Sequence, residues 1–140
     1  VGGQRSVVKG DMSVAIGHHA KALESMNTAI GSEASAIAQS STAIGKGTRT
    51  EGIGSTAVGA HAYAKQNSDV AMGLHSNATG GQSTAIGQAT RAEGGQSTAI
   101  GSGATSTGRF SVAVGTNAKA NNDHDVAVGS FYYRESCRYF

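Results

Sequence analysis

Histidine is the residue type whose spacing most suggests chemistry in this chain. His19, His61 and His75 each stand two residues after a glycine, and His61 and His75 are 14 residues apart. In a chain that repeats every 14 residues, these two rings would lie one strand spacing apart, about 4.8 Å. Two imidazoles lack the third protein ligand that a catalytic zinc site uses. We therefore interpret these histidines as solvated surface residues.

No other residue type is arranged for catalysis. Paired carboxylates do not recur at facing positions, and the serines follow the repeat described below rather than a Ser/His/Asp arrangement. Asp11, Asp69, Asp123 and Asp125 are scattered, whereas calcium-binding solenoids place aspartate at fixed positions of a nonapeptide repeat. The sequence thus predicts no enzyme, no metal site and no cofactor.

Composition limits the fold and the partners. The 140 residues fit one domain, and a net charge of only +2 is no signature of nucleic-acid binding. No apolar run approaches the roughly 18 residues of a membrane span, so we expect no membrane contact by this part. Cys137 is the single cysteine and cannot form a bridge within the chain. With 21 Gly, no Pro and 5% aromatics, the chain favours short strands, tight turns and a thin core.

A strict repeat organises the chain. Glycine recurs nine times at intervals of 14 residues, from Gly17 to Gly129. Each of these glycines follows an alanine and one larger apolar residue, and the apolar residues are Ile16, Ile30, Ile44, Val58, Met72, Ile86, Ile100, Val114 and Val128. The five-residue segment reads Ser/Asn/Asp, then Thr/Val, then Ala, then Ile/Val/Met, then Gly. Its alternation predicts a β-strand.

A second short strand follows each repeat glycine. Small residues stand three and five positions after it, as in Ala20 and Ala22, and four coils mark the next turn with Gly52, Gly80, Gly94 and Gly108. Strand, turn, strand and turn complete one 14-residue coil. A repeat this short buries its apolar face only by stacking on its neighbours. The sequence therefore predicts an all-β parallel solenoid, or β-roll, with strands pairing 14 residues apart.

The two faces of the first strand lead to a prediction about core and interface. We expect the Ile/Val/Met column named above to face the interior, opposite the small residues of the second strand. The alanine column would then face outward and allow close approach of a neighbouring chain, through Ala29, Ala43, Ala57, Ala71, Ala85, Ala99 and Ala113. Ala71→Leu or Ala85→Leu would then disrupt assembly more than folding. With the opposite orientation a long apolar stripe would be exposed, so either arrangement favours a homo-oligomer.

The second strand also provides a candidate binding surface. Residues between its small columns should point outward, and with the neighbouring histidines they form a varied, mildly basic stripe of Arg49, His61, Tyr63, His75, Arg91 and Lys119. This stripe is the best candidate in the sequence for a face that contacts a ligand. The alternative is an ordinary solvated surface.

The repeat resembles a known family. Ser13-Val-Ala-Ile-Gly17, Ser41-Thr-Ala-Ile-Gly45 and Ser83-Thr-Ala-Ile-Gly87, with the following Ala-x-Ala pairs, are similar to the head repeats of YadA-like trimeric autotransporter adhesins over roughly residues 11–130. The resemblance implies a left-handed parallel β-roll, a homotrimer, and display from the outer membrane on the bacterial cell surface. It also implies binding to host extracellular matrix proteins or cell receptors, or autoagglutination.

Two segments depart from the repeat. Val1-Gly2 looks like the end of an earlier copy but stands 15 residues before Gly17, which predicts a slip in register. We assign residues 1–130 to the head β-roll and residues 131–140 to a non-repeat tail, which holds five of the seven aromatic residues. The tail could be an end cap, the start of another module or an added sequence.

Two other functions fit parts of the pattern. A trimeric phage or viral fibre shares the fibrous repeat. Ice-binding solenoids carry threonine ladders, and Thr28, Thr42, Thr56, Thr84 and Thr98 form a partial one. Valines interrupt that ladder, as at Val70, and each coil contributes only one threonine. Ice binding is therefore the weaker alternative.

Overall fold

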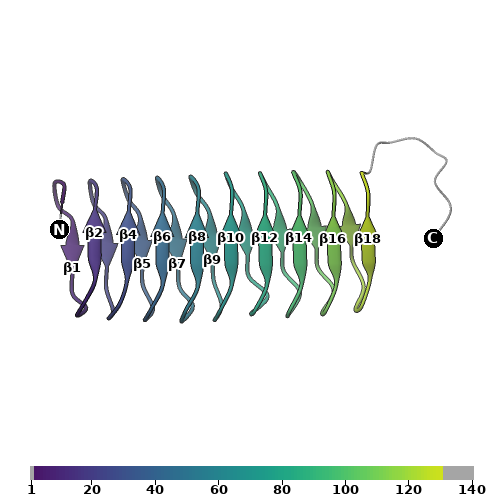
Figure 1. The fold of residues 1–140 in the computed structure, drawn as a ribbon, viewed down its shortest axis with the longest axis horizontal. Helices are drawn as coiled ribbons and strands as arrows, with labels where there is room; N and C mark the ends of the chain where they lie inside the picture. The colour runs from purple at the N-terminus through teal and green to yellow at the C-terminus, as the bar shows by residue number, and fades with distance from the viewer. Residues whose placement is uncertain (1, 131–140) are drawn as a thin grey trace.

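The computed structural model describes residues 2–130, which form a straight rod of stacked coils (Figure 1). Within these residues 18 short strands form two nine-stranded sheets. No helix that could cross a membrane occurs in the described part of the chain. The predicted all-β parallel solenoid of 14-residue coils is thereby confirmed.

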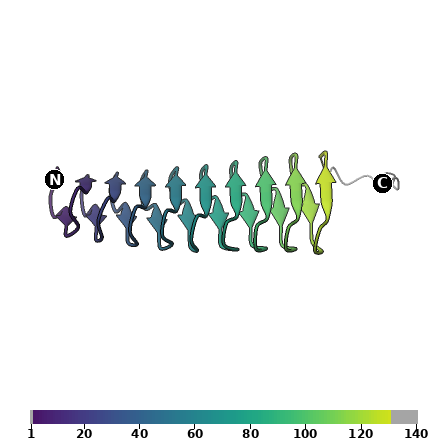
Figure 2. The ribbon, with the colours of Figure 1, turned by 60° about the horizontal axis from the view of Figure 1, so that its bottom comes forward.

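Each coil contributes one strand to each sheet, and the two rows of strands run along the rod (Figure 2). The first sheet consists of the three-residue strands β2 (Val14–Ile16), β4 (Thr28–Ile30), β6 (Thr42–Ile44), β8 (Thr56–Val58), β10 (Val70–Met72), β12 (Thr84–Ile86), β14 (Thr98–Ile100), β16 (Val112–Val114) and β18 (Val126–Val128). The second sheet consists of the two-residue strands β1 (Val7–Val8), β3 (Lys21–Ala22), β5 (Ser35–Ala36), β7 (Arg49–Thr50), β9 (Tyr63–Ala64), β11 (Asn77–Ala78), β13 (Arg91–Ala92), β15 (Thr105–Ser106) and β17 (Lys119–Ala120).

Register is uniform along the rod. Every strand pairs in parallel with the strand 14 residues away, so that Ala71 lies beside Ala85 and Met72 beside Ile86. The pattern extends to the start of the described chain, where Gly2 forms a parallel bridge with Ile16. The predicted slip is therefore wrong, because Gly3, and not Gly2, stands 14 residues before Gly17. The tail at residues 131–140 lies outside the described residues.

The turns explain the repeat glycines. Gly87 has φ of 129°, and a Cβ there would lie 2.8 Å from the carbonyl carbon of Gly101 in the next coil. Because real Cβ atoms do not approach backbone so closely, a side chain at this position would push the coils apart. Two residues later the backbone is left-handed whatever the residue, with φ of 57° at His61 and 56° at His75, a conformation uncommon outside glycine. The stacking of coils maintains it.

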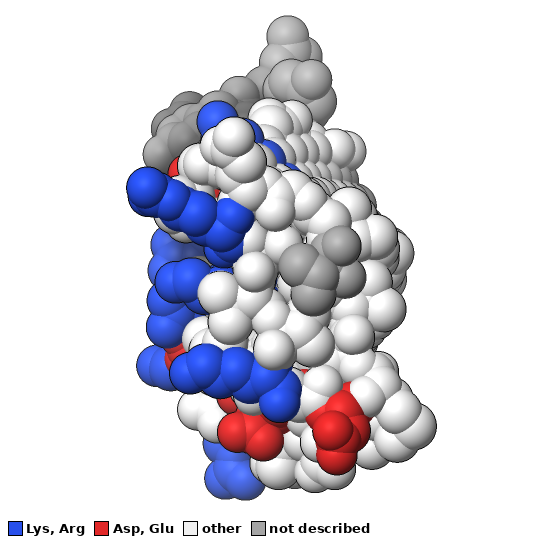
Figure 3. All heavy atoms as spheres, turned by 90° about the vertical axis from the view of Figure 1, so that its left-hand side faces the viewer, with Lys and Arg blue, Asp and Glu red and all other residues white. Residues whose placement is uncertain are grey.

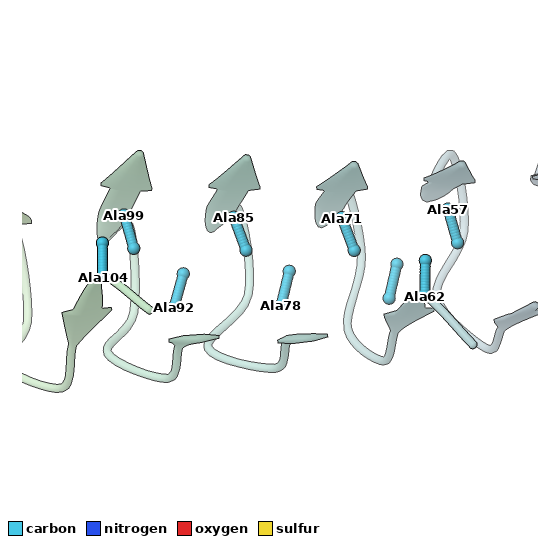
Figure 4. Packing of buried hydrophobic residues seen from close by; sticks show 9 residues of the cluster. Ala57, Ala62, Ala71, Ala78, Ala85, Ala92, Ala99 and Ala104 are labelled. Carbon is cyan, nitrogen blue, oxygen red and sulfur yellow. The ribbon is translucent and has the colours of Figure 1, made fainter. Parts of the chain in front are cut away.

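Alanine, and not isoleucine or valine, fills the interior. Alanine methyl groups from the two sheets point toward one another (Figure 4). The seven alanines predicted to form an interface, Ala29, Ala43, Ala57, Ala71, Ala85, Ala99 and Ala113, are fully buried inside a single roll. They are therefore not available to a neighbouring chain, and that prediction is wrong.

The column predicted as core lies on the outer surface. Ile16 is 48% exposed and Val128 is 76% exposed. None of the nine residues of this column is buried: Ile16, Ile30, Ile44, Val58, Met72, Ile86, Ile100, Val114 and Val128. The reason is the narrow space between the sheets, which is filled by methyl groups and small polar side chains. Larger residues on the alternate positions of each strand must point outward.

A buried polar column accompanies the alanines. Asn27, Ser41, Ser55, Asp69, Ser83, Ser97 and Ser111 are fully buried. The Asp69 carboxylate accepts hydrogen bonds from the N–H and the Oγ of Ser83, both at 2.8 Å, and from the N–H of Gln66 at 2.8 Å. Buried polar groups are tolerated when they are hydrogen-bonded. This polar column therefore links the turn that follows each strand of the second sheet to its own coil and to the next coil.

We predict that Ala85→Leu destabilises the single roll. Three added carbon atoms have no room between the sheets, and overpacking of this kind costs about 1–3 kcal/mol. Urea unfolding followed by circular dichroism would measure the loss. The control is Gln88→Leu, because Gln88 is exposed and the same position one coil earlier already holds Leu74. Equal stability of the two variants would contradict an alanine-filled interior.

Candidate ligand-binding face

The outward side of the second sheet places four of the six predicted binding residues in one column. Arg49 (β7), Tyr63 (β9), Arg91 (β13) and Lys119 (β17) are aligned by the strand register. Each is followed by a buried small residue, so its own side chain points away from the interior. We call this surface the basic face.

The other two residues, His61 and His75, lie in the turn that precedes this sheet. Their rings are stacked, with centroids 5.1 Å apart and planes inclined by 8°. The ring of His61 also covers Gly47, where a Cβ would lie 2.7 Å from Nδ1. Within residues 2–130 no group of three or more His, Cys, Asp or Glu side chains could hold a metal ion. The histidines therefore border the basic face as an aromatic pair.

Two glutamates that the sequence analysis did not single out belong to this face. Glu51 Oε1 lies 2.5 Å from Nε of Arg49, and Glu93 Oε1 accepts a hydrogen bond of 2.8 Å from Nε of Arg91. Both arginine side chains remain more than half exposed, so each pair contributes at most about 1 kcal/mol to stability. Their effect is to orient the guanidinium groups. The sequence did contain a sign of these pairs, because each glutamate stands two residues after its arginine, and residues two apart lie on the same face of a strand.

Positive charge concentrates on this side of the rod. Outward positions of the second sheet and of the residues just after its strands carry Lys9, Lys21, Arg49, Lys65, Arg91 and Lys119, against the acidic Glu51 and Glu93. Viewed along the rod, Lys and Arg gather along one side of the surface (Figure 3). A nearly neutral chain thus presents a positive strip along its length, which favours anionic partners.

Tyr63 lies within this strip beside an ion pair. Burial raises the pKa of its phenol above the ordinary value of 10.0, the neighbouring Glu51 raises that pKa further, and Arg49 opposes the shift. The phenol therefore stays protonated across the physiological range.

The threonine ladder lies on the opposite sheet. Thr28, Thr42, Thr56, Thr84 and Thr98 are half-buried and share the outer face of the first sheet with the Ile/Val/Met column. They are therefore interleaved with apolar side chains and do not form a separate flat face.

Fold and surface together define a repeat protein that presents long, regular faces along a rod. A family model described as the YadA head domain repeat matches residues 9–24, 28–48, 51–76, 78–104 and 106–131. The chain belongs to this family, which confirms the resemblance seen in the sequence; its members are typically non-enzymatic adhesins. A comparison with curated proteins finds no match to the chain.

We predict that Glu51 and Arg49 shift the ionisation of Tyr63 in opposite directions. Glu51→Gln removes a negative charge and should lower the pKa of Tyr63 toward 10.0, whereas Arg49→Gln removes a positive charge and should raise it. Tyrosine 13Cζ shifts recorded across the alkaline range, assigned with Tyr63→Phe, would report both. Glu93→Gln is the control and should leave Tyr63 unchanged. A pKa that rises with Glu51→Gln would contradict this electrostatic arrangement.

Proposed function

We propose that this chain is the head of a trimeric autotransporter adhesin, displayed from the outer membrane on the bacterial cell surface. In this proposal three copies form a homotrimer through the outer face of the first sheet. Their basic faces bind host extracellular matrix proteins or cell receptors, or mediate autoagglutination. The observation that carries the proposal is the family match together with an apolar stripe along the whole rod.

The apolar stripe supports association with identical copies. Ile16, Met72, Ile86, Ile100 and Val128 are between 37% and 76% exposed, although they are large and apolar. Long exposed apolar patches mark interaction sites. A partner that covers such a stripe over its full length must repeat with the same spacing, and a copy of this chain does so. The threefold symmetry and the left-handed winding of each roll are what the family implies.

The basic face supports ligand binding, because trimerisation through the first sheet leaves the second sheet outward. Arg49 and Arg91 are three coils apart and are oriented alike by Glu51 and Glu93. A long ligand could therefore contact the same surface several times along one rod, and again on each of three rods. Multiple weak contacts of this kind raise avidity without any single strong site.

The experiment that tests the assembly is the solution mass of the 140-residue chain by light scattering after size exclusion. We expect a mass three times the 14.0 kDa of one chain. A mass of one chain would remove the support for the adhesin proposal.

We predict that Ile86→Asp abolishes the trimer while the roll stays folded. Burying an isoleucine side chain contributes about 1.5–3 kcal/mol, and three carboxylates would meet near the axis. Scattering mass and circular dichroism would separate assembly from folding. Gln88→Asp introduces the same charge in an exposed turn and should remain trimeric. If Ile86→Asp keeps the full mass, the interface lies elsewhere.

We also predict that the double variant Arg49→Gln/Arg91→Gln weakens binding to immobilised matrix proteins at least tenfold. Added salt should weaken the binding of the unsubstituted chain to a similar extent. The control double variant, Arg5→Gln/Lys46→Gln, removes the same charge from exposed turns. Equal loss in both would indicate an effect of net charge alone. Full binding by the first variant would exclude the basic face as the contact surface.

A further inference from the structure

The second turn of the coil, which follows the second-sheet strands, carries a hollow of about 280 Å³. Gly81 and Gly95 form its middle, with Asn67 at one end and Arg109 and Phe110 at the other. The volume lies near the lower end of small-molecule sites, about 300–1,000 Å³. It therefore suits one ring-sized group and not a folded partner.

Missing side chains create the hollow. The position that holds Gly81 and Gly95 in two successive coils carries Asn67 in the coil before them and Arg109 in the coil after. A Cβ at Gly81 would lie 3.7 Å from Cβ of Gln66, and one at Gly95 would lie 3.5 Å from the nearest backbone oxygen. Both are ordinary contact distances. There is thus room for side chains that the chain does not supply.

The floor of the hollow presents hydrogen-bond donors. In the flanking coils a side-chain oxygen at this position accepts from the N–H one coil earlier: Asn67 Oδ1 from Ile53 at 3.0 Å, and Asp123 Oδ1 from Arg109 at 2.9 Å. Gly81 and Gly95 have no side chain to accept in this way, and within residues 2–130 the N–H groups of Asn67 and Gly81, one coil earlier in each case, have no acceptor. A ligand oxygen could take the place that the Asp123 carboxylate takes next to Arg109.

The walls add paired amides, one charge and one aromatic ring. Gln96 Nε2 donates to Gln82 Oε1 at 3.0 Å, which leaves Gln82 Nε2 and Gln96 Oε1 free to donate to and accept from hydroxyl groups. Arg109 is the one charged residue of the lining and forms no ion pair within residues 2–130. Its guanidinium lies 5.5 Å from the centre of the Phe110 ring.

The Phe110 ring lines one end of the hollow. Its far side is stacked on His124 of the next coil, with centroids 5.3 Å apart and planes inclined by 16°. The Arg109 guanidinium also lies over the ring, so the ring and the cation line this end of the hollow together. Phe110 remains 43% exposed. An apolar ring face next to amide groups and an arginine can pack against the C–H face of a sugar while its polar groups are hydrogen-bonded.

We propose that this hollow binds a carboxylate-bearing sugar ring, a uronic or sialic acid unit of a glycan. The carboxylate contacts Arg109 and the N–H group of Gly81, the hydroxyls contact the amides of Gln82 and Gln96, and the sugar ring packs against Phe110. The site lies on the turn and not on the basic face. Saccharide binding and matrix-protein binding can therefore each fail without the other.

The test is an NMR titration of the 15N-labelled chain with glucuronate and with N-acetylneuraminate, beside glucose and acetate. We expect at least one acidic sugar to shift the Gly81 and Gly95 N–H signals and the side-chain amides of Gln82 and Gln96. Glucose and acetate should bind at least tenfold more weakly. Binding by only one of the two acids supports the proposal and identifies the source of the carboxylate.

Three variants sharpen the test. Arg109→Gln should raise the Kd for the acidic sugar at least tenfold, and Gly95→Asn should abolish binding by filling the hollow. Lys46→Gln removes one exposed positive charge elsewhere and should bind normally. Melting curves would verify folding, and the exposed Arg109 substitution keeps the test valid if Gly95→Asn unfolds. The proposal would be overturned if acetate or glucose bound as tightly as glucuronate. It would also be overturned if neither acidic sugar shifted the N–H signals of Gly81 and Gly95.

Discussion

The close approach of the two sheets, separated by little more than alanine methyl groups, determines the rest of this structure. With so little space inside, every larger side chain must take an outward position. One sheet consequently exposes isoleucine and valine, and the other exposes lysine, arginine and tyrosine. A single roll buries little apolar surface, and its interior is mostly methyl and hydroxyl groups. The large apolar side chains are left on the outer surface, so the same constraint that thins the core produces the exposed apolar stripe.

The sequence predicted the strands, their parallel register and the 14-residue coil, because all three follow directly from the spacing of the glycines. It did not predict which face of the first strand is inside. Alternation shows that Ala85 and Ile86 lie on opposite faces, but it is symmetric with respect to inside and outside. Choosing the larger residue for the core fails here since the space between the sheets excludes it. The serine column could have indicated the inner face. Ser83 shares its face with Ala85, and its hydroxyl is buried and hydrogen-bonded to Asp69 and to the N–H of Gly80 in the turn.

The outward position of the residues of the basic face was predicted in part. Arg49, Tyr63, Arg91 and Lys119 alternate with small buried residues, so their outward direction could be inferred. His61 and His75 lie beside the basic face and not on it. Their position adopts a left-handed turn in every described coil, whether it holds histidine, glutamate or glycine. Residue types that vary so widely do not reveal a shared backbone conformation. The hollow near Gly81 was missed because it is made by absent side chains, and its only trace in the sequence is a pair of glycines in two successive coils.

Uniform register has a consequence for how such rods change in length. Each coil ends where the next begins, with the same backbone direction and the same contact between successive glycines. Unequal recombination that removes or duplicates 14 codons would therefore rejoin every column without a new junction having to fold. A gain or loss of 13 or 15 codons would break all columns beyond it. The length of the rod and the number of exposed sites can thus change by whole coils during evolution, independently of the residues exposed on any one coil.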